Sequence, residues 1–131
     1  MIRRMEKQDL DEVSAIWLSS NTSAHSFIPA DYWEKNLPLV KELLPQAEVY
    51  VYEKNHRIMG FIGLNENYIE GLFVSEELRS EGIGRRLLDY VKKNKAELSL
   101  DVYQKNEGAV RFYKREGFSI TGKGVDEETG E

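Results

Sequence analysis

The hydrophobic pattern of the chain changes its period at Val74. Before that residue, β-like runs at residues 48–53, 57–64 and 68–74 follow one another across short turns, which predicts an antiparallel meander. After it, two glycines precede a helix-period segment, a further β-like run at residues 98–103 and a last helix. Strands joined through a helix run parallel in one sheet, because the crossover returns the chain to the same end. The sequence therefore predicts an α/β fold, with a central, mostly antiparallel mixed sheet and one β-α-β unit.

The N-terminal third predicts a short strand and two helices. Residues 2–5 favour the strand, and the polar segment at residues 21–29 predicts a loop between the helices. Apolar residues recur at helical spacing on both helices: Leu10, Val13, Ile16 and Trp17 on the first, and Tyr32, Trp33, Leu37 and Val40 on the second. No linker or repeat divides the 131 residues, so we expect one domain over residues 1–131.

Cysteine count and charge exclude several classes of protein. The chain has no cysteine, which rules out a disulfide framework and a thiolate metal site, and with only two histidines we expect no metal. A net charge of −5 argues against a nucleic-acid binder and favours cationic partners. No apolar run approaches the roughly 20 residues of a membrane-spanning helix, and the N-terminus lacks the apolar core of a signal peptide. We therefore expect a cytoplasmic protein that binds neither nucleic acid nor membrane.

The glycine loop after Val74 predicts an anion site. Gly82 and Gly84 lack Cβ atoms, so the N–H groups of the first helical turn are open, and the positive end of the helix dipole suits a phosphate. Three arginines, at positions 79, 85 and 86, add positive charge there. The alternative is that the glycines only shape a turn and permit close packing. The third glycine of a dinucleotide fingerprint is replaced by Leu87, and the P-loop signature is absent.

Two blocks of the sequence resemble the GNAT acetyltransferases. Residues 79–84, Arg-Ser-Glu-Gly-Ile-Gly, match the Arg/Gln-x-x-Gly-x-Gly/Ala loop of that family. Residues 106–118 resemble its Asn-x-x-Ala-x-x-Phe-Tyr-x-x-x-Gly-Phe block, at the expected distance downstream. The N-terminal part, with residues 25–28 and 31–33, is similar to the small bacterial YiaC-like members, so the likeness covers nearly the whole chain.

The resemblance implies an enzyme that moves the acetyl group of acetyl-CoA, its co-substrate, to a primary amine. The acceptor would be a small molecule, a peptide N-terminus or a protein lysine. The residues that the resemblance assigns to the cofactor are Leu72, Phe73, Val74, Arg79, Ser80, Glu81, Gly82, Ile83, Gly84 and Asn106. An alternative is a non-catalytic acyl-CoA-binding module, and a weaker one is a nucleotide-binding regulator.

Asn106 and Tyr113 are the next candidates. They are seven residues apart, close to two helical turns, so both side chains share one face of the last helix. By resemblance, Asn106 would bind the pantetheine arm, and Tyr113 would give its phenolic proton to the departing thiolate of coenzyme A. The alternatives are a plain helix N-cap for Asn106 and an amphipathic core aromatic for Tyr113.

Glu70 is the candidate general base. Strict alternation along residues 68–74 places it on one face with Tyr68, Leu72 and Val74, where it interrupts an apolar surface. A carboxylate in such a setting is suited to take a proton from the attacking ammonium. A solvated sheet residue is an equal alternative, and Glu66 is a rival base.

His25, Phe27 and Tyr32 are the candidate acceptor-binding residues. Aromatic faces and a titratable ring in a polar loop can line a pocket for an amine. A structural loop residue is the stronger alternative for His25.

The C-terminal end departs from the family pattern. GNAT domains usually finish with a strand that forms a hairpin with the one before it, and residues 118–122 predict only the first of the pair. Residues 126–130 resemble the connecting turn of that hairpin. We therefore expect the terminal strand to be missing, so that either the domain is shortened at this end or a partner chain completes the edge. Short sheet edges favour a homodimer without establishing one.

Overall fold

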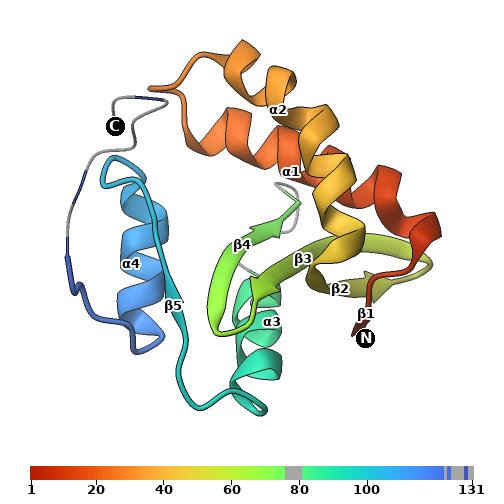
Figure 1. Ribbon diagram of the computed structural model, residues 1–131. Helices are drawn as coiled ribbons and strands as arrows, with labels where there is room; N and C mark the ends of the chain where they lie inside the picture. The colour runs from red at the N-terminus through yellow and green to blue at the C-terminus, as the bar shows by residue number, and fades with distance from the viewer. Residues whose placement is uncertain (76–80, 123, 125–128, 130–131) are drawn as a thin grey trace.

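A mixed sheet forms the centre of the computed structural model, which describes residues 1–75, 81–122, 124 and 129. Within that part of the chain, the strand order is β1-β2-β3-β4-β5 (Figure 1). The first three pairings are antiparallel and β4 pairs with β5 in parallel, as the change of period predicts. The strands are β1 (Ile2–Arg4), β2 (Glu48–Lys54), β3 (Arg57–Asn65), β4 (Tyr68–Val74) and β5 (Ser99–Leu100).

Helices cover both faces of the sheet. In Figure 1, α1 and α2 lie on one side and α3 and α4 on the other. Each face of the sheet has its own hydrophobic core, and alternate residues of β3 contribute to opposite cores. Phe61 belongs to the core with Val13 of α1, and Ile62 belongs to the core with Leu87 of α3. The helices are α1 (Leu10–Ala24), α2 (Ala30–Leu43), α3 (Ile83–Lys92) and α4 (Glu107–Arg115), with short 3-10 turns at Lys7–Asp9 and Leu44–Gln46.

The first helix is longer than the sequence predicts. Residues 21–24, expected in a loop, form the last turn of α1. The side chains of Asn21 and Thr22 donate to the carbonyls of Trp17 and Leu18, at 2.9 and 2.8 Å. Polar side chains that donate to main-chain carbonyls of the preceding turn are compatible with a helix. The polar composition of residues 21–24 does not reveal these hydrogen bonds, so it predicted a loop.

The C-terminal strands are shorter than predicted. β5 covers Ser99–Leu100 instead of residues 98–103, and residues 118–122 form no strand. A strand needs a partner for its main-chain hydrogen bonds, and β5 lies beside β4 only at the first two residues of β4. Residues 126–128 and 130, part of the expected connecting turn, lie outside the described residues.

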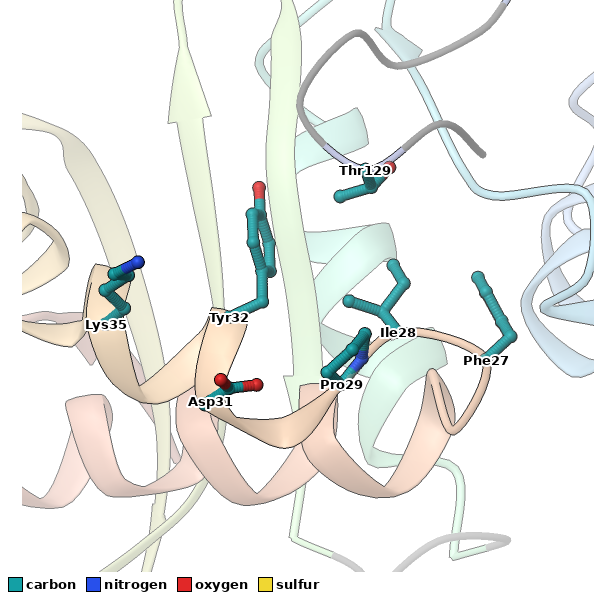
Figure 2. A pocket seen from close by; sticks show the side chains of 7 residues that line it. All are labelled: Phe27, Ile28, Pro29, Asp31, Tyr32, Lys35 and Thr129. Carbon is teal, nitrogen blue, oxygen red and sulfur yellow. The ribbon is translucent and has the colours of Figure 1, made fainter.

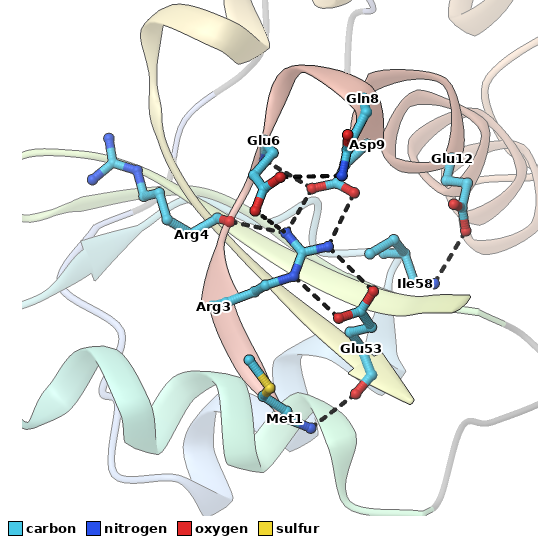
Figure 3. Close-up of polar contacts among 9 residues, drawn as sticks. All are labelled: Met1, Arg3, Arg4, Glu6, Gln8, Asp9, Glu12, Glu53 and Ile58. Carbon is cyan, nitrogen blue, oxygen red and sulfur yellow. Dashed lines mark hydrogen bonds and ion pairs between the residues drawn. The ribbon is translucent and has the colours of Figure 1, made fainter. Parts of the chain in front are cut away.

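An ion network ties β1 to the rest of the domain (Figure 3). The guanidinium of Arg3 donates to both carboxylate oxygens of Asp9, at 2.7 and 3.1 Å, and to those of Glu53, at 3.2 and 3.3 Å. Asp9 also accepts the main-chain N–H of Glu6 at 2.8 Å. The hydrogen bonds from Arg3 hold the pKa values of the Asp9 and Glu53 carboxyls below their usual range. This three-residue strand is therefore held by charge as well as by the sheet.

Candidate active site

The strands β4 and β5 diverge immediately after their first residues. Their pairing consists of Tyr68 with Ser99 and Ile69 with Leu100. From Glu70 to Val74, β4 has β3 on one side and no described strand on the other. Alternate residues of a strand direct their main-chain groups to opposite sides, so Phe73 pairs with Phe61 of β3 while Leu72 and Val74 face this edge. The Val74 carbonyl accepts from the Ser20 hydroxyl at 3.5 Å, which leaves the Val74 N–H and the main-chain groups of Leu72 open to a ligand that hydrogen-bonds like a strand.

A one-residue bulge interrupts β4 at Glu70. Gly63 pairs with Gly71 and Leu64 pairs with Ile69, so Glu70 has no opposite residue on β3. The predicted alternation is thus wrong: Ile69 shares the α3 side with Leu72 and Val74. Glu70 is exposed, and it does not interrupt an apolar face. Its role as general base stays a prediction, now without the apolar setting that motivated it.

Two carboxylates lie near this fork. The hydroxyl of Tyr68 donates to Asp101 at 2.8 Å, and burial, this hydrogen bond and the nearby charge of Glu70 raise the pKa of Tyr68 to about 12. The sequence reasoning missed Asp101, which directly follows β5 and belongs to no motif. The mouth of the fork is therefore acidic, as suits a cationic acceptor.

The glycine loop has the conformation that the sequence favours. Gly82 precedes α3 with φ of +79°, a left-handed conformation that side chains with a Cβ disfavour. A Cβ on Gly84 would lie 3.6 Å from Phe112 and 3.7 Å from Val74, so this glycine also serves close packing. The structure thus supports the turn and close-packing interpretation of the glycines, and the anion site stays a prediction.

The other loop positions divide into exposed and anchored residues. Glu81 and Gly82 are exposed, whereas Ile83 is buried in the α3 core, where its side chain anchors the helix. Arg79 and Ser80 lie outside the described residues. The two remaining arginines have protein partners: Arg85 lies 3.7 Å from Glu116, and Arg86 donates to the hydroxyl of Tyr52 at 2.9 Å.

Asn106 is the N-cap of α4. Its Oδ1 accepts the main-chain N–H of Ala109 at 3.3 Å, which fulfils the capping alternative. Its Nδ2 lies 3.1 Å from Nε2 of His25, at the other end of the chain. Both ends of the Asn106 amide, Oδ1 and Nδ2, therefore have a partner at the N-terminus of α4.

Tyr113 sits half-buried on α4. Its ring makes edge contacts with Phe112 and Phe118, at centroid distances of 5.1 and 5.5 Å. Within the described part of the chain its hydroxyl has no hydrogen-bond partner, and burial raises the pKa of this phenol well above its usual value. Tyr113 is thus a neutral, uncommitted donor, although its aromatic contacts fit the packing alternative as well.

A pocket of about 270 Å³ lies at the start of α2 (Figure 2). Phe27 and Tyr32, two predicted acceptor residues, line it, with Asp31 and Lys35 beside them and Thr129 across from them. The sequence reasoning missed Asp31 and Lys35, because charged residues at a helix start are common on any surface.

His25 is not among the residues that line this pocket. It is 8% exposed and packs among Phe27, Trp33 and Tyr103, at ring-centroid distances of 5.6, 5.3 and 5.1 Å. Burial lowers the pKa of its imidazole, and the Asn21 carbonyl opposes that shift more weakly. Among the described residues, Nδ1 of His25 and Nε1 of Trp33 have no hydrogen-bond partner. The structure thus favours the structural alternative for His25.

The described residues form neither a membrane-spanning helix nor a cluster of metal-ligating side chains. No helix there is long and apolar enough to cross a membrane. The same residues contain no group of three or more His, Cys, Asp and Glu side chains that could hold a metal ion.

Comparisons with known proteins agree on one family. A family model described as the acetyltransferase (GNAT) domain matches residues 6–129. The peptidyl-lysine N-acetyltransferase YiaC of Escherichia coli K12 is 36% identical over 131 residues, covering 98% of this chain and 90% of YiaC. The peptidyl-lysine N-acetyltransferase YjaB of the same organism is 33% identical over 130 residues, covering 98% and 88%.

Solved structures share the fold. The solution structure of apo YjaB from Escherichia coli superposes with a TM-score of 0.86 at 34% identity, covering 96% of this chain and 87% of YjaB. The PaiA N-acetyltransferase of Thermoplasma acidophilum, solved in complex with coenzyme A, has a TM-score of 0.83 at 21% identity, covering 95% and 92%. The latter likeness concerns the fold alone.

Proposed function

The chain belongs to the GNAT acetyltransferase family and transfers the acetyl group of acetyl-CoA to a primary amine, and from this premise we propose that its acceptor is a lysine side chain of a protein or peptide. Both relatives above 30% identity that are described here carry peptidyl-lysine N-acetyltransferase in their names. A small-molecule amine is the competing acceptor.

The observation that carries the proposal is the ring of Phe27. It lines the pocket, and the ammonium of Lys105 lies 5.6 Å from its centroid. A lysine ammonium is therefore attracted to this ring, and an incoming lysine would gain the same attraction by displacing Lys105. The carboxylate of Asp31, which also lines the pocket, adds a charge of the right sign, opposed by the ammonium of Lys35 in the same lining.

The cofactor would lie along the open edge of β4. Leu72 and Val74 would offer main-chain groups to pantetheine, Asn106 its amide, and residues 79–84 the N–H groups that bind pyrophosphate, while Phe73, whose main chain pairs with β3, would hold the edge in place. The acceptor nitrogen, once deprotonated, attacks the thioester carbonyl, and the carbon–sulfur bond then breaks. Overall, one ammonium and acetyl-CoA give an amide, free coenzyme A thiol and one proton.

Each predicted catalytic residue has one task in this scheme. Glu70, exposed at the fork, would receive the ammonium proton directly or through water. Tyr113 remains protonated at neutral pH because burial raises its pKa. A thiol such as that of coenzyme A has a pKa of about 8.5, below that of a buried phenol, so Tyr113 serves the departing sulfur mainly as a hydrogen-bond donor.

A peptide assay tests the acceptor. The substrate is a peptide with a blocked N-terminus and one lysine, compared with the same peptide carrying arginine and with one whose N-terminus is free but which lacks lysine. We expect acetyl-CoA-dependent addition of one acetyl group to the lysine peptide alone, located by tandem mass spectrometry. Acetylation confined to the free N-terminus, or to small amines offered in parallel, contradicts the proposal.

Location and assembly are also part of the proposal. We place the enzyme in the cytoplasm, where acetyl-CoA and newly made proteins are both present. A homodimer stays a prediction, and sedimentation velocity distinguishes the 15.2 kDa monomer from a dimer.

A further inference from the structure

Two side chains that are 81 residues apart in the sequence meet at the ends of α1 and α4. The approach of His25 Nε2 to Asn106 Nδ2, at 3.1 Å, can be assigned a direction. Oδ1 of Asn106 accepts the N–H of Ala109, and a main-chain N–H can only donate, so the end of the amide that faces His25 is its NH2 group. His25 must then accept through Nε2 and carry its ring proton on Nδ1.

The surroundings of His25 hold the ring in this state. The ring packs against those of Phe27, Trp33 and Tyr103, which leave it little freedom to turn. Its main chain is fixed as well: the N–H of His25 bonds to Asn21 at 3.0 Å, and its carbonyl accepts from Ile28 at 2.9 Å. A neutral acceptor is thus presented to Asn106 from a rigid position.

We propose that His25 is a positioning residue, which orients the Asn106 amide for the pantetheine arm of acetyl-CoA. The inference rests on the proposed role of Asn106 in cofactor binding. With one amide proton on His25 and Oδ1 on Ala109, the amide plane is fixed before the cofactor arrives. The second amide proton remains to bind the cofactor, and a preorganised donor loses less entropy on binding.

The same contact joins the two sides of the reaction. His25 follows α1 and lies two residues before the pocket residue Phe27, whereas Asn106 caps the helix that carries Tyr113. The Phe27 and Tyr103 rings, 5.7 Å apart, complete the bridge between these segments. His25 therefore acts through Asn106 and touches neither substrate.

A pair of substitutions at His25 separates hydrogen bonding from packing. His25→Phe keeps an aromatic ring among its aromatic neighbours but removes the acceptor, whereas His25→Gln offers an amide oxygen in its place. We expect His25→Phe to raise the KM for acetyl-CoA and the Kd for coenzyme A by roughly 3- to 10-fold, as for one lost hydrogen bond. The KM for the lysine peptide should stay unchanged, and His25→Gln should recover most of the cofactor affinity.

A double-mutant cycle tests whether His25 acts through Asn106. The effects of His25→Phe and Asn106→Ala on the Kd for coenzyme A, measured by titration calorimetry, should be non-additive, with the double variant no weaker than Asn106→Ala alone. Additive effects, or a His25→Gln variant no better than His25→Phe, overturn the inference. An unchanged Kd in Asn106→Ala overturns the cofactor role of Asn106 and the inference with it. Acetylation of the lysine peptide by the wild-type enzyme decides the proposed acceptor separately.

The tautomer gives a test that needs no substrate. An isolated imidazole favours its proton on Nε2, but the contact with Asn106 requires it on Nδ1. Long-range ¹H–¹⁵N correlation spectra of the labelled full chain distinguish these two forms. An Nδ1–H tautomer that reverts in Asn106→Ala supports the inference, and an Nε2–H tautomer in the wild-type protein overturns it.

Discussion

The polar cluster around Arg3 and the one around His25 are built in opposite ways. At the N-terminal edge, the Arg3 guanidinium bonds to both oxygens of Asp9 and of Glu53. Around His25, the Nδ1 atom and the Trp33 Nε1 atom lack partners among the described residues. Unsatisfied buried donors cost stability, and they tend to persist where function requires them. We therefore expect the first cluster to set stability and the second to set activity.

Removal of Arg3 tests whether its cluster stabilises the fold, and it has the largest expected effect. Arg3→Met leaves Asp9, which is 5% exposed, buried without its cation, so we expect a loss of about 3 kcal/mol in the free energy of unfolding. Urea denaturation followed by circular dichroism measures this loss. Arg4→Met is the matched control, because Arg4 is exposed and should lose less than 1 kcal/mol. Equal losses in the two variants would contradict the assignment.

Removal of the Tyr113 hydroxyl tests whether this residue contributes to catalysis. Tyr113→Phe should lower kcat by about 100-fold, the smaller end of the range for the loss of one positioned hydrogen-bond donor. Since the hydroxyl has no described partner, the free energy of unfolding and the Kd for coenzyme A should barely change. Thiol release during acetyl transfer measures kcat, and Tyr90→Phe on α3 is a matched control. A wild-type kcat in Tyr113→Phe would show that Tyr113 serves only to pack α4.

Acid pH tests whether the carboxylates of Asp9 and Glu53 are the source of the stability that Arg3 provides. Asp9 and Glu53 have lowered pKa values in the folded state, so their contribution is present above the ordinary values of 3.8 and 4.5. It is lost as the pH falls through the lowered folded values. We therefore expect the stability difference between wild type and Arg3→Met to shrink between pH 6 and pH 3. Thermal midpoints across this range measure the difference, and a constant difference would exclude the two carboxylates as its source.

Substitution of Phe27 has the smallest expected effect. Phe27→Leu keeps an apolar side chain but removes the aromatic face, so the KM for a lysine peptide should rise about 2- to 5-fold. The KM for acetyl-CoA should not change. Steady-state kinetics with both substrates measures the two constants, with Ser26→Ala as the exposed neighbouring control. A rise in the acetyl-CoA constant alone would place Phe27 on the cofactor side.

Local patterns in the sequence were sufficient to predict the order of strands and helices from β1 to α4 and the change from antiparallel to parallel pairing, although not the absence of a strand at residues 118–122. Alternation, helical spacing and glycine are short-range signals, and each constrains the backbone whatever packs against it. The left-handed conformation of Gly82 and the N-cap role of Asn106 belong to this group, since both depend on the residue type and its immediate neighbours. The family likeness added the cofactor and the reaction to these local features.

Long-range pairing decided the remainder. The bulge at Glu70 depends on the register with β3, the short β5 depends on its divergence from β4, and the contact of His25 with Asn106 joins opposite ends of the fold. The sequence by itself determined the family, the elements and the residues capable of chemistry. Only the tertiary structure decided which of those residues are buried, paired or free to react, because burial and pairing are set by neighbours that lie far away along the chain.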